Sequence, residues 1–244
     1  MIITSKTNPT VKKISSLADK KFRRQYGEYL VEGTKPVNEC IKAGKDVVLI
    51  VCTEEYANCY NSPFVVSRQV FEHISTEKTP QGVMAVVKMP QTDLSAPAGS
   101  CLLLDRLQDP GNLGTIIRTA NAAGYKDLYL INCTDAYSPK CVRASMSGIF
   151  FINIHVGTED EVLQTLSGVP LICADLDGEN IFTFNPPKQY CLCIGNEGSG
   201  LSDVISKKAS HTVKIPMEET CESLNAAISA GIAMYQLKNK NIEV

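Results

Sequence analysis

The stretch "LLLDRLQDPGNLGTIIRTANAAGY", residues 102–125, has the pattern of a buried strand that leads into a helix. Its apolar run ends at Asp105, and the turn-forming sequence Asp109-Pro110-Gly111 follows. Gly124 stands where the helix would end. This stretch predicts a strand–turn–helix unit of an α/β fold.

The predicted helix has one apolar face and two polar residues that this face does not explain. Asn112 falls at or beside the N-cap, where capping explains it about as well as a function does. Capping does not explain Arg118, because a cation is unfavourable near the positive end of a helix. A guanidinium in a cleft at a strand end is suited to gripping phosphate or ribose oxygens. The apolar face has the spacing i, i+3, i+4, i+7 and consists of Leu113, Ile116, Ile117 and Ala120.

Composition is that of an ordinary globular protein of 244 residues, 44% apolar and 20% charged. No apolar run approaches the length of a membrane span, and the first residues lack the apolar core of a signal peptide. The ten cysteines are scattered without a Cys-x-x-Cys pair, which favours reduced, buried thiols in a cytoplasmic protein. The three histidines lie in unrelated contexts, so no metal site is predicted.

Charge is distributed unevenly along the chain, whose formal net charge is −2. Residues 1–90 contain 13 Lys and Arg against 9 Asp and Glu, so the remainder is acidic. The basic beginning fits either a solvated helix face or a surface that binds a polyanion. Its cations are Lys6, Lys12, Lys13, Lys20, Lys21, Arg23 and Arg24.

The most probable linker is the small, polar, proline-containing segment 92–100. Before it, strand-like runs at 29–31, 47–52 and 84–87 alternate with helical stretches in a small α/β unit. After it, strands separated by helical stretches predict a parallel sheet covered by helices. These strands are 101–105, 128–132, 151–155, 171–175, 190–194 and 212–215. Ligands of such sheets bind at the carboxyl ends of the strands.

A glycine-rich loop follows the predicted strand 190–194 in "YCLCIGNEGSGLSDVI", residues 190–205. It has neither the dinucleotide-binding spacing of glycines nor the Gly-Lys-Ser/Thr ending of a phosphate-binding loop. Its Glu197 disfavours an anionic ligand and suits a cationic or hydroxyl-bearing one. The alternative is a plain tight turn, and Ser202 is placed to cap the helix that follows.

A helix rich in small residues is predicted within "VKIPMEETCESLNAAISAGIAMYQL", residues 213–237. Ser223 stands at its predicted head, where N-capping alone could explain it. Asn225 falls in the predicted first turn, where core packing does not require an amide.

In this order and spacing, three segments resemble the motifs of the SpoU/TrmH branch of the SPOUT RNA methyltransferases. They are "DPGNLGTIIRTANAAG", "IGNEGSGLS" and "IPM…ESLNAAISAGI". Segment 138–154 is similar to the family's stretch between motifs one and two, and "YLVEGTKPVNECIKAG" to its substrate-binding domain. The resemblance implies a small α/β RNA-binding domain at 1–91, a linker at 92–100 and a catalytic domain at 101–244 with a deep trefoil knot.

The resemblance also implies a homodimeric enzyme that uses S-adenosyl-L-methionine, forms S-adenosyl-L-homocysteine and needs no metal. Arg118 would be its central catalytic residue, and Asn112, Glu197, Ser223 and Asn225 would orient Arg118 and the substrate. Because arginine is a poor base, we expect it to stabilise a developing alkoxide. The cofactor would lie against Leu176, Gly195, Asn196, Gly200, Ile215, Met217, Leu224 and Asn225.

The expected substrate is a ribose 2′-hydroxyl, most probably in 23S ribosomal RNA. A transfer-RNA substrate and a non-catalytic RNA-binding role in ribosome assembly are the alternatives. A nicotinamide or flavin oxidoreductase is disfavoured because the dinucleotide fingerprint is missing, and a cysteine nucleophile because no thiol lies beside an obvious base. The expected RNA contacts are Lys12, Lys13, Lys20, Lys21, Arg23, Arg24 and Arg143.

Overall fold

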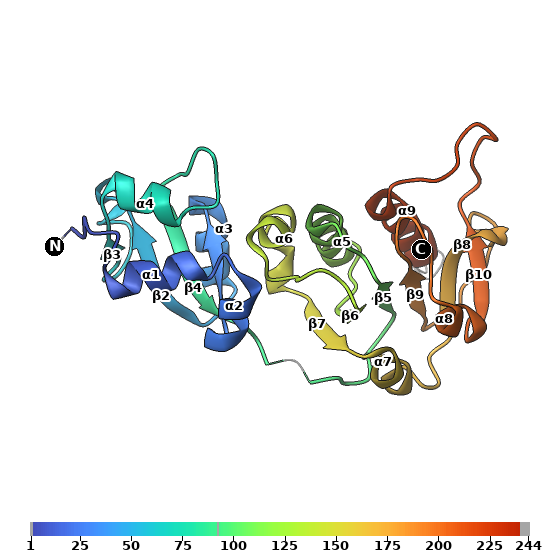
Figure 1. Cartoon of the computed structure of the whole chain (residues 1–244). Helices are drawn as coiled ribbons and strands as arrows, with labels where there is room; N and C mark the ends of the chain where they lie inside the picture. The colour runs from blue at the N-terminus through green and yellow to red at the C-terminus, as the bar shows by residue number, and fades with distance from the viewer. Residues whose placement is uncertain (1, 92, 240–244) are drawn as a thin grey trace. The chain divides into compact units, whose positions relative to one another are not determined.

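The computed structural model describes residues 2–91 and 93–239, in two compact units (Figure 1). Unit 1 comprises Met1–Gln91 and Asp135–Phe150, and unit 2 comprises Thr92–Thr134 and Phe151–Val244. The chain therefore leaves unit 1, enters unit 2, returns to unit 1 for one short segment and finishes in unit 2.

Unit 1 is a four-stranded sheet with helices, and its sheet order is β1-β4-β2-β3. Strand β4 pairs antiparallel with β1 and β2, while the short β3 runs parallel to β2. Helices α1 and α4 contribute Val11, Ile14, Val70 and Phe71 to its core. The strands predicted in this region are confirmed to within one residue. The elements are α1 (Pro9–Ser16), α2 (Lys20–Tyr26), β1 (Glu28–Glu32), α3 (Thr34–Lys42), β2 (Val47–Cys52), η1 (Glu54–Tyr56), β3 (Phe64–Val65), α4 (Arg68–Ile74), β4 (Val83–Lys88), α6 (Pro139–Ala144) and η2 (Gly148–Phe150).

The returning segment, residues 135–150, differs from the predicted uninterrupted domain at 101–244. Its helix α6 packs against β1, and the rings of Tyr29 and Tyr137 lie 5.0 Å apart. The buried Arg23 donates to Asp135 Oδ2 from Nε and Nη2 at 3.0 and 2.6 Å. A buried guanidinium needs an anionic partner, and this segment supplies it.

Unit 2 confirms the predicted helix-covered parallel sheet. All neighbouring strands in the order β10-β8-β9-β5-β6-β7 run parallel. Helices α7 and α8 cover one face of the sheet through Val162 and Ile205, and α9 packs against both α5 and β9. The elements are β5 (Cys101–Asp105), α5 (Pro110–Ala122), β6 (Asp127–Ile131), β7 (Asn153–Gly157), α7 (Glu159–Thr165), β8 (Leu171–Asn180), β9 (Cys191–Ile194), α8 (Asp203–Lys207), β10 (His211–Lys214) and α9 (Ala226–Asn239).

Strand β8 is longer than predicted, because its second half pairs with β10 after a register shift between Thr212 and Val213. The predicted apolar face of α5 is confirmed, and its four residues are fully buried.

The strand order reverses direction between β5 and β9. From β5 the chain proceeds outward through β6 and β7, then crosses to β8 and returns to place β9 beside β5. Parallel sheets bind ligands where such a reversal leaves a crevice at the carboxyl ends. In this chain that edge carries the ends of β5, β8 and β9.

Within the described ranges, no helix is long and apolar enough to span a lipid bilayer. All ten cysteines have free thiols, and Cys59 and Cys221 are the exposed ones.

Candidate active site

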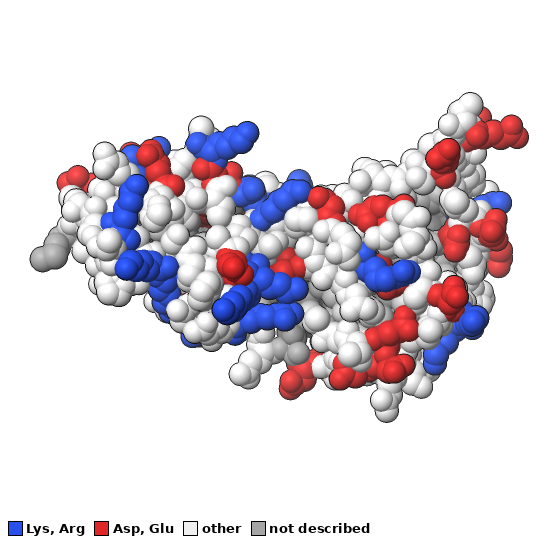
Figure 2. Space-filling model, in the orientation of Figure 1, with Lys and Arg blue, Asp and Glu red and all other residues white. Residues whose placement is uncertain are grey.

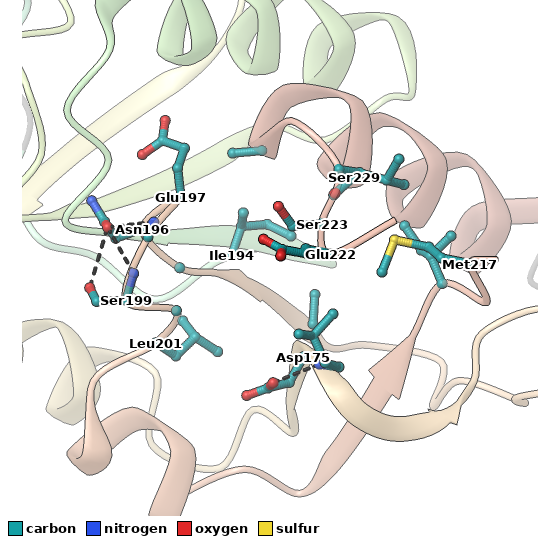
Figure 3. A pocket seen from close by; sticks show the side chains of 18 of the residues that line it. Asp175, Ile194, Asn196, Glu197, Ser199, Leu201, Met217, Glu222, Ser223 and Ser229 are labelled. Carbon is teal, nitrogen blue, oxygen red and sulfur yellow. Dashed lines mark hydrogen bonds between the residues drawn. The ribbon is translucent and has the colours of Figure 1, made fainter. Parts of the chain in front are cut away.

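A cavity of about 610 Å³ opens where β8, β9 and β10 end and α9 begins. Figure 3 shows Asp175, Glu222 and Met217 reaching it from three different segments. Every predicted cofactor residue except Asn225 lines this cavity, as do two predicted catalytic residues, Glu197 and Ser223. The predicted cofactor residues in its wall are Leu176, Gly195, Asn196, Gly200, Ile215, Met217 and Leu224.

The glycine-rich loop is a tight turn, closed by two reciprocal backbone hydrogen bonds of 3.0 Å between Asn196 and Gly200. Asn196 Oδ1 accepts from the amides of Gly198 and Ser199, as the dashed lines of Figure 3 indicate for Ser199. A side chain at Gly195 would bring its Cβ within 2.2 Å of the Gly200 carbonyl carbon. Gly195 therefore allows a backbone approach that no other residue permits.

The three predicted motifs meet through side-chain amides beside this turn. Asn112 Nδ2 donates to Glu197 Oε1 at 2.8 Å, and Asn225 Nδ2 donates to Asn112 Oδ1 at 3.0 Å. We call Asn112, Glu197 and Asn225 the amide network. Its members come from α5, from the turn after β9 and from the start of α9, so it joins residues more than 80 positions apart.

The helix caps differ from the predictions at two of the three motifs. Asp109, not Asn112, caps α5 by accepting from the Asn112 amide at 2.8 Å. Helix α9 begins at Ala226, so Ser223 lies in the preceding loop. Asn225 takes the capping position by accepting from the amides of Ala227 and Ile228. Ser202 caps α8 as predicted.

Arg118 is exposed on α5, and it does not line the cavity. Its guanidinium makes no hydrogen bond or ion pair with another residue of the described ranges. Helices α5 and α9 lie close together here, since a Cβ on Gly231 would be 3.7 Å from Thr119 Cγ2. The structure unites Asn112, Glu197 and Asn225 but leaves Arg118 outside their contacts, so its role stays a prediction.

Comparison with protein families decides the family of this chain. The model of the SpoU rRNA methylase family matches residues 99–235, which include all three motifs. The chain belongs to the SpoU rRNA methylase family. A second model, the MRM3-like substrate binding domain, matches residues 8–85.

Relatives within the SpoU family match this chain over nearly its whole length. The 23S rRNA (guanosine(2553)-2′-O)-methyltransferase RlmP of Bacillus subtilis is 32% identical, over 97% of this chain and 98% of its own. An AdoMet-bound rRNA methyltransferase from Sinorhizobium meliloti is 29% identical with a TM-score of 0.90, covering 100% of this chain and 99% of its own. The SpoU methyltransferase AviRb from Streptomyces viridochromogenes, in complex with AdoMet, is 27% identical with a TM-score of 0.85, covering 95% and 97%.

The predicted RNA-binding residues belong to unit 1, where Figure 2 shows Lys and Arg gathered over α1 and α2. Arg23 differs from the others, because its side chain is 3% exposed and donates internally to Leu17 O, Ala18 O and Asp135. Lys13 is half-buried in an ion pair with Glu28. Arg143 pairs with Glu77. The exposed members of the set on α1 and α2 are Lys12, Lys20, Lys21 and Arg24.

Sequence reasoning missed four residues of the SpoU site. Asp175 and Glu222 line the cavity with carboxylates. Asp105, which is fully buried, and Arg106 hold the glycine-rich turn. Asp105 could have been suspected as an acid that ends an apolar strand. The positive φ of Arg106, +56°, has no signal in a single sequence.

Two further chemistries find no support at the SpoU site. In the described part of the chain, no group of three or more His, Cys, Asp and Glu is arranged to bind a metal. Cys133 follows β6, and burial raises the pKa of its thiol to about 11, so it is not a thiolate at neutral pH.

Proposed function

We propose that this SpoU-family chain transfers the methyl group of S-adenosylmethionine to a ribose 2′-hydroxyl of 23S ribosomal RNA. The observation that carries this proposal is the cavity at the carboxyl ends of β8, β9 and β10, whose wall joins the amide network of three motifs. The substrate class follows the names of full-length relatives that methylate 23S rRNA at a 2′-oxygen. Work on ribosomal RNA leads us to propose a cytoplasmic location.

The residues present fit S-adenosylmethionine. A volume of about 610 Å³ lies within the usual range for small-molecule sites. Leu176, Ile215, Met217 and Leu224 offer apolar surface for an adenine, and the open backbone around Gly195 offers amides and carbonyls. The cavity wall contains carboxylates but no Lys or Arg among its described residues, which suits a ligand that carries a sulfonium charge.

When bound, this cofactor supplies an electrophilic methyl group on a positively charged sulfur. The chain has to hold the ribose in line and favour loss of the hydroxyl proton. Arg118 cannot act as a base because its pKa exceeds ~12, so we assign it the stabilisation of negative charge developing on the 2′-oxygen. The amide network and Ser223 orient the ribose beside the cavity.

We further propose that unit 1 binds RNA through Lys12, Lys20, Lys21 and Arg24, and we no longer include Arg23. Reversing these four charges should weaken RNA binding and flatten its dependence on salt, by a slope of about 0.7–0.9 per lost phosphate contact. Reversal of Lys35 and Lys42, which are exposed on α3, is the matched control. An unchanged salt slope in the fourfold variant would refute this surface.

We propose a homodimer that uses the exposed side of α9. Ile228 and Tyr235, which are 54% and 46% exposed, lie seven residues apart and so share one face of the helix. Ile228→Glu should then convert a dimer into a monomer in light scattering. The passage of the C-terminal segment through a knot is likewise our proposal, and it rests on the family's fold.

Transfer RNA is the alternative substrate. A solved structure described as concerning 2-OH methylation of C/U34 on tRNA matches this chain with a TM-score of 0.52, 28% identity and 57% coverage. The full-length matches to 23S rRNA enzymes and the substrate-binding domain favour ribosomal RNA.

The deciding experiment incubates the purified protein with methyl-labelled S-adenosylmethionine and, separately, 23S rRNA, 16S rRNA and transfer RNA. We expect label in 23S rRNA at one nucleotide, which mapping of 2′-O-methyl sites in cells with and without the gene should also identify. Label in transfer RNA alone would establish the alternative substrate. RNA binding without any methylation would establish a non-catalytic role.

A further inference from the structure

Arg106, the residue immediately after β5, contacts the glycine-rich turn from outside the cavity. Its Nη2 donates to Gly200 O at 3.1 Å, and its carbonyl oxygen accepts from Asn196 Nδ2 at 2.9 Å. These contacts hold both ends of the Asn196–Gly200 turn. Arg106 itself does not line the cavity, whereas every residue of the turn does.

A buried carboxylate fixes Arg106 in place. Asp105 is fully buried at the end of β5, and both its oxygens accept from Arg106 Nε, at 3.2 and 3.1 Å. The Asp105 Oδ2 atom also accepts from the Ser202 amide at 2.8 Å. The same carboxylate therefore orients the guanidinium and anchors the chain just after the turn.

The backbone of Arg106 lies in the left-handed region at φ +56°. Residues other than glycine seldom adopt this conformation, and they keep it where the surroundings fix it. Here the surroundings are the contacts to Asp105, Asn196 and Gly200. The conformation directs the carbonyl and the guanidinium of one residue toward the same turn.

The turn also connects the cavity to the amide network, because its second residue, Glu197, accepts from Asn112. We propose that Arg106 is a positioning residue that holds the Asn196–Gly200 turn in the shape needed to bind the cofactor. This inference rests on the proposed function, which assigns the cavity to S-adenosylmethionine.

The test compares Arg106→Gly with the matched control Asn132→Gly. Asn132 ends β6, also has a positive φ of +51°, and its side chain makes no hydrogen bond within the described ranges. Glycine relieves the backbone at both positions, so a purely structural role predicts equal or higher thermal stability in both variants. Only Arg106→Gly removes the guanidinium from the turn.

For Arg106→Gly we expect the Kd of S-adenosylmethionine, measured by calorimetry, to rise about tenfold. Its melting temperature should not fall, and Asn132→Gly should bind as the wild type does. Arg106→Lys should bind with intermediate affinity, because a single ammonium cannot reproduce the fork between Asp105 and Gly200.

Hydrogen exchange of the cofactor-free protein separates this inference from the proposed function. We expect the amides of 196–200 to exchange faster in Arg106→Gly than in the wild type. Unchanged exchange and an unchanged Kd would overturn the positioning role while cofactor binding by the wild type upheld the proposed function. A wild type that binds no S-adenosylmethionine would overturn the proposed function, and faster exchange would then still show that Arg106 holds the turn.

Discussion

Two polar clusters of unit 2 sit near opposite ends of its parallel strands and differ in exposure. Near the amino ends of β6 and β7, Asp127 Oδ1 contacts His155 Nε2 at 3.2 Å and accepts from Asn153 Nδ2 at 3.0 Å. The other ring nitrogen of His155 lies 2.9 Å from Asp93 O, and its ring stacks on Tyr129. Asp127 and His155 are buried, and their partners all come from the protein.

The amide network at the carboxyl ends is open by contrast. Glu197 and Asn225 are exposed and Asn112 is half-buried, although hydrogen bonds join all three. Buried polar groups must be satisfied internally, whereas exposed ones can exchange water for a ligand. The difference teaches that the first cluster serves stability and the second serves binding and catalysis.

The largest effect is expected from Arg118→Ala, which should lower methyl transfer by about 10²–10³-fold if the guanidinium stabilises charge in the transition state. Its exposure means that the melting temperature should hardly change. Single-turnover rates at saturating cofactor measure the loss. Near-normal turnover of Arg118→Lys would show that the fork geometry has no special role.

The buried cluster should respond in the opposite way. Asp127→Ala leaves the donors of His155 and Asn153 without their acceptor, so the free energy of unfolding should fall by about 2–4 kcal/mol. Urea titration measures this change. The folded variant should keep its rate of methyl transfer, and a large loss of rate would break the division between the clusters.

Asn112→Ala and Asp109→Ala sharpen the comparison within one helix turn. We expect about tenfold slower methyl transfer for Asn112→Ala, because the network loses its central residue. Asp109→Ala should instead cost about 1 kcal/mol of stability through loss of the cap. If Asn112→Ala methylates RNA normally, the network is structural.

The smallest effect concerns Glu28 of unit 1. Burial alone would raise the pKa of this carboxyl, but hydrogen bonds and charges from Lys13 and Lys88 outweigh burial and lower it. A lowered folded-state pKa means that the stabilisation is complete above the ordinary glutamate pKa and disappears as the pH falls through the lowered value. Glu28→Gln should remove this part of the acid dependence, less than about 1 kcal/mol in urea titrations between pH 3 and 6.

The strands, the α5 face and the cavity wall could be predicted because they follow local patterns. Apolar periodicity buried Leu113 and Ile116, and parallel strands bring the loops after β8, β9 and β10 to one edge. Ser223 and Asn225 could not be ranked as caps, since serine and asparagine cap equally well.

Long-range contacts account for the remaining misses. Arg23 looks like its basic neighbours until Asp135, 112 residues away, gives it a buried partner. The return of 135–150 to unit 1 depends on that pair and on the contact of Tyr137 with Tyr29. Arg106 escaped notice because its role arises from a backbone angle and from Gly200, 94 residues further on.

The two-piece construction of unit 1 affects how the protein can be made and divided. On the ribosome, 93–134 emerge before 135–150, so β5 and β6 are synthesised while Arg23 still lacks its carboxylate. A gene fragment that stops at residue 91 would encode an N-terminal piece without Asp135, Tyr137 and α6. Isolating this piece as a stand-alone RNA probe therefore requires grafting the returning segment onto it, for example through a short artificial connector after β4.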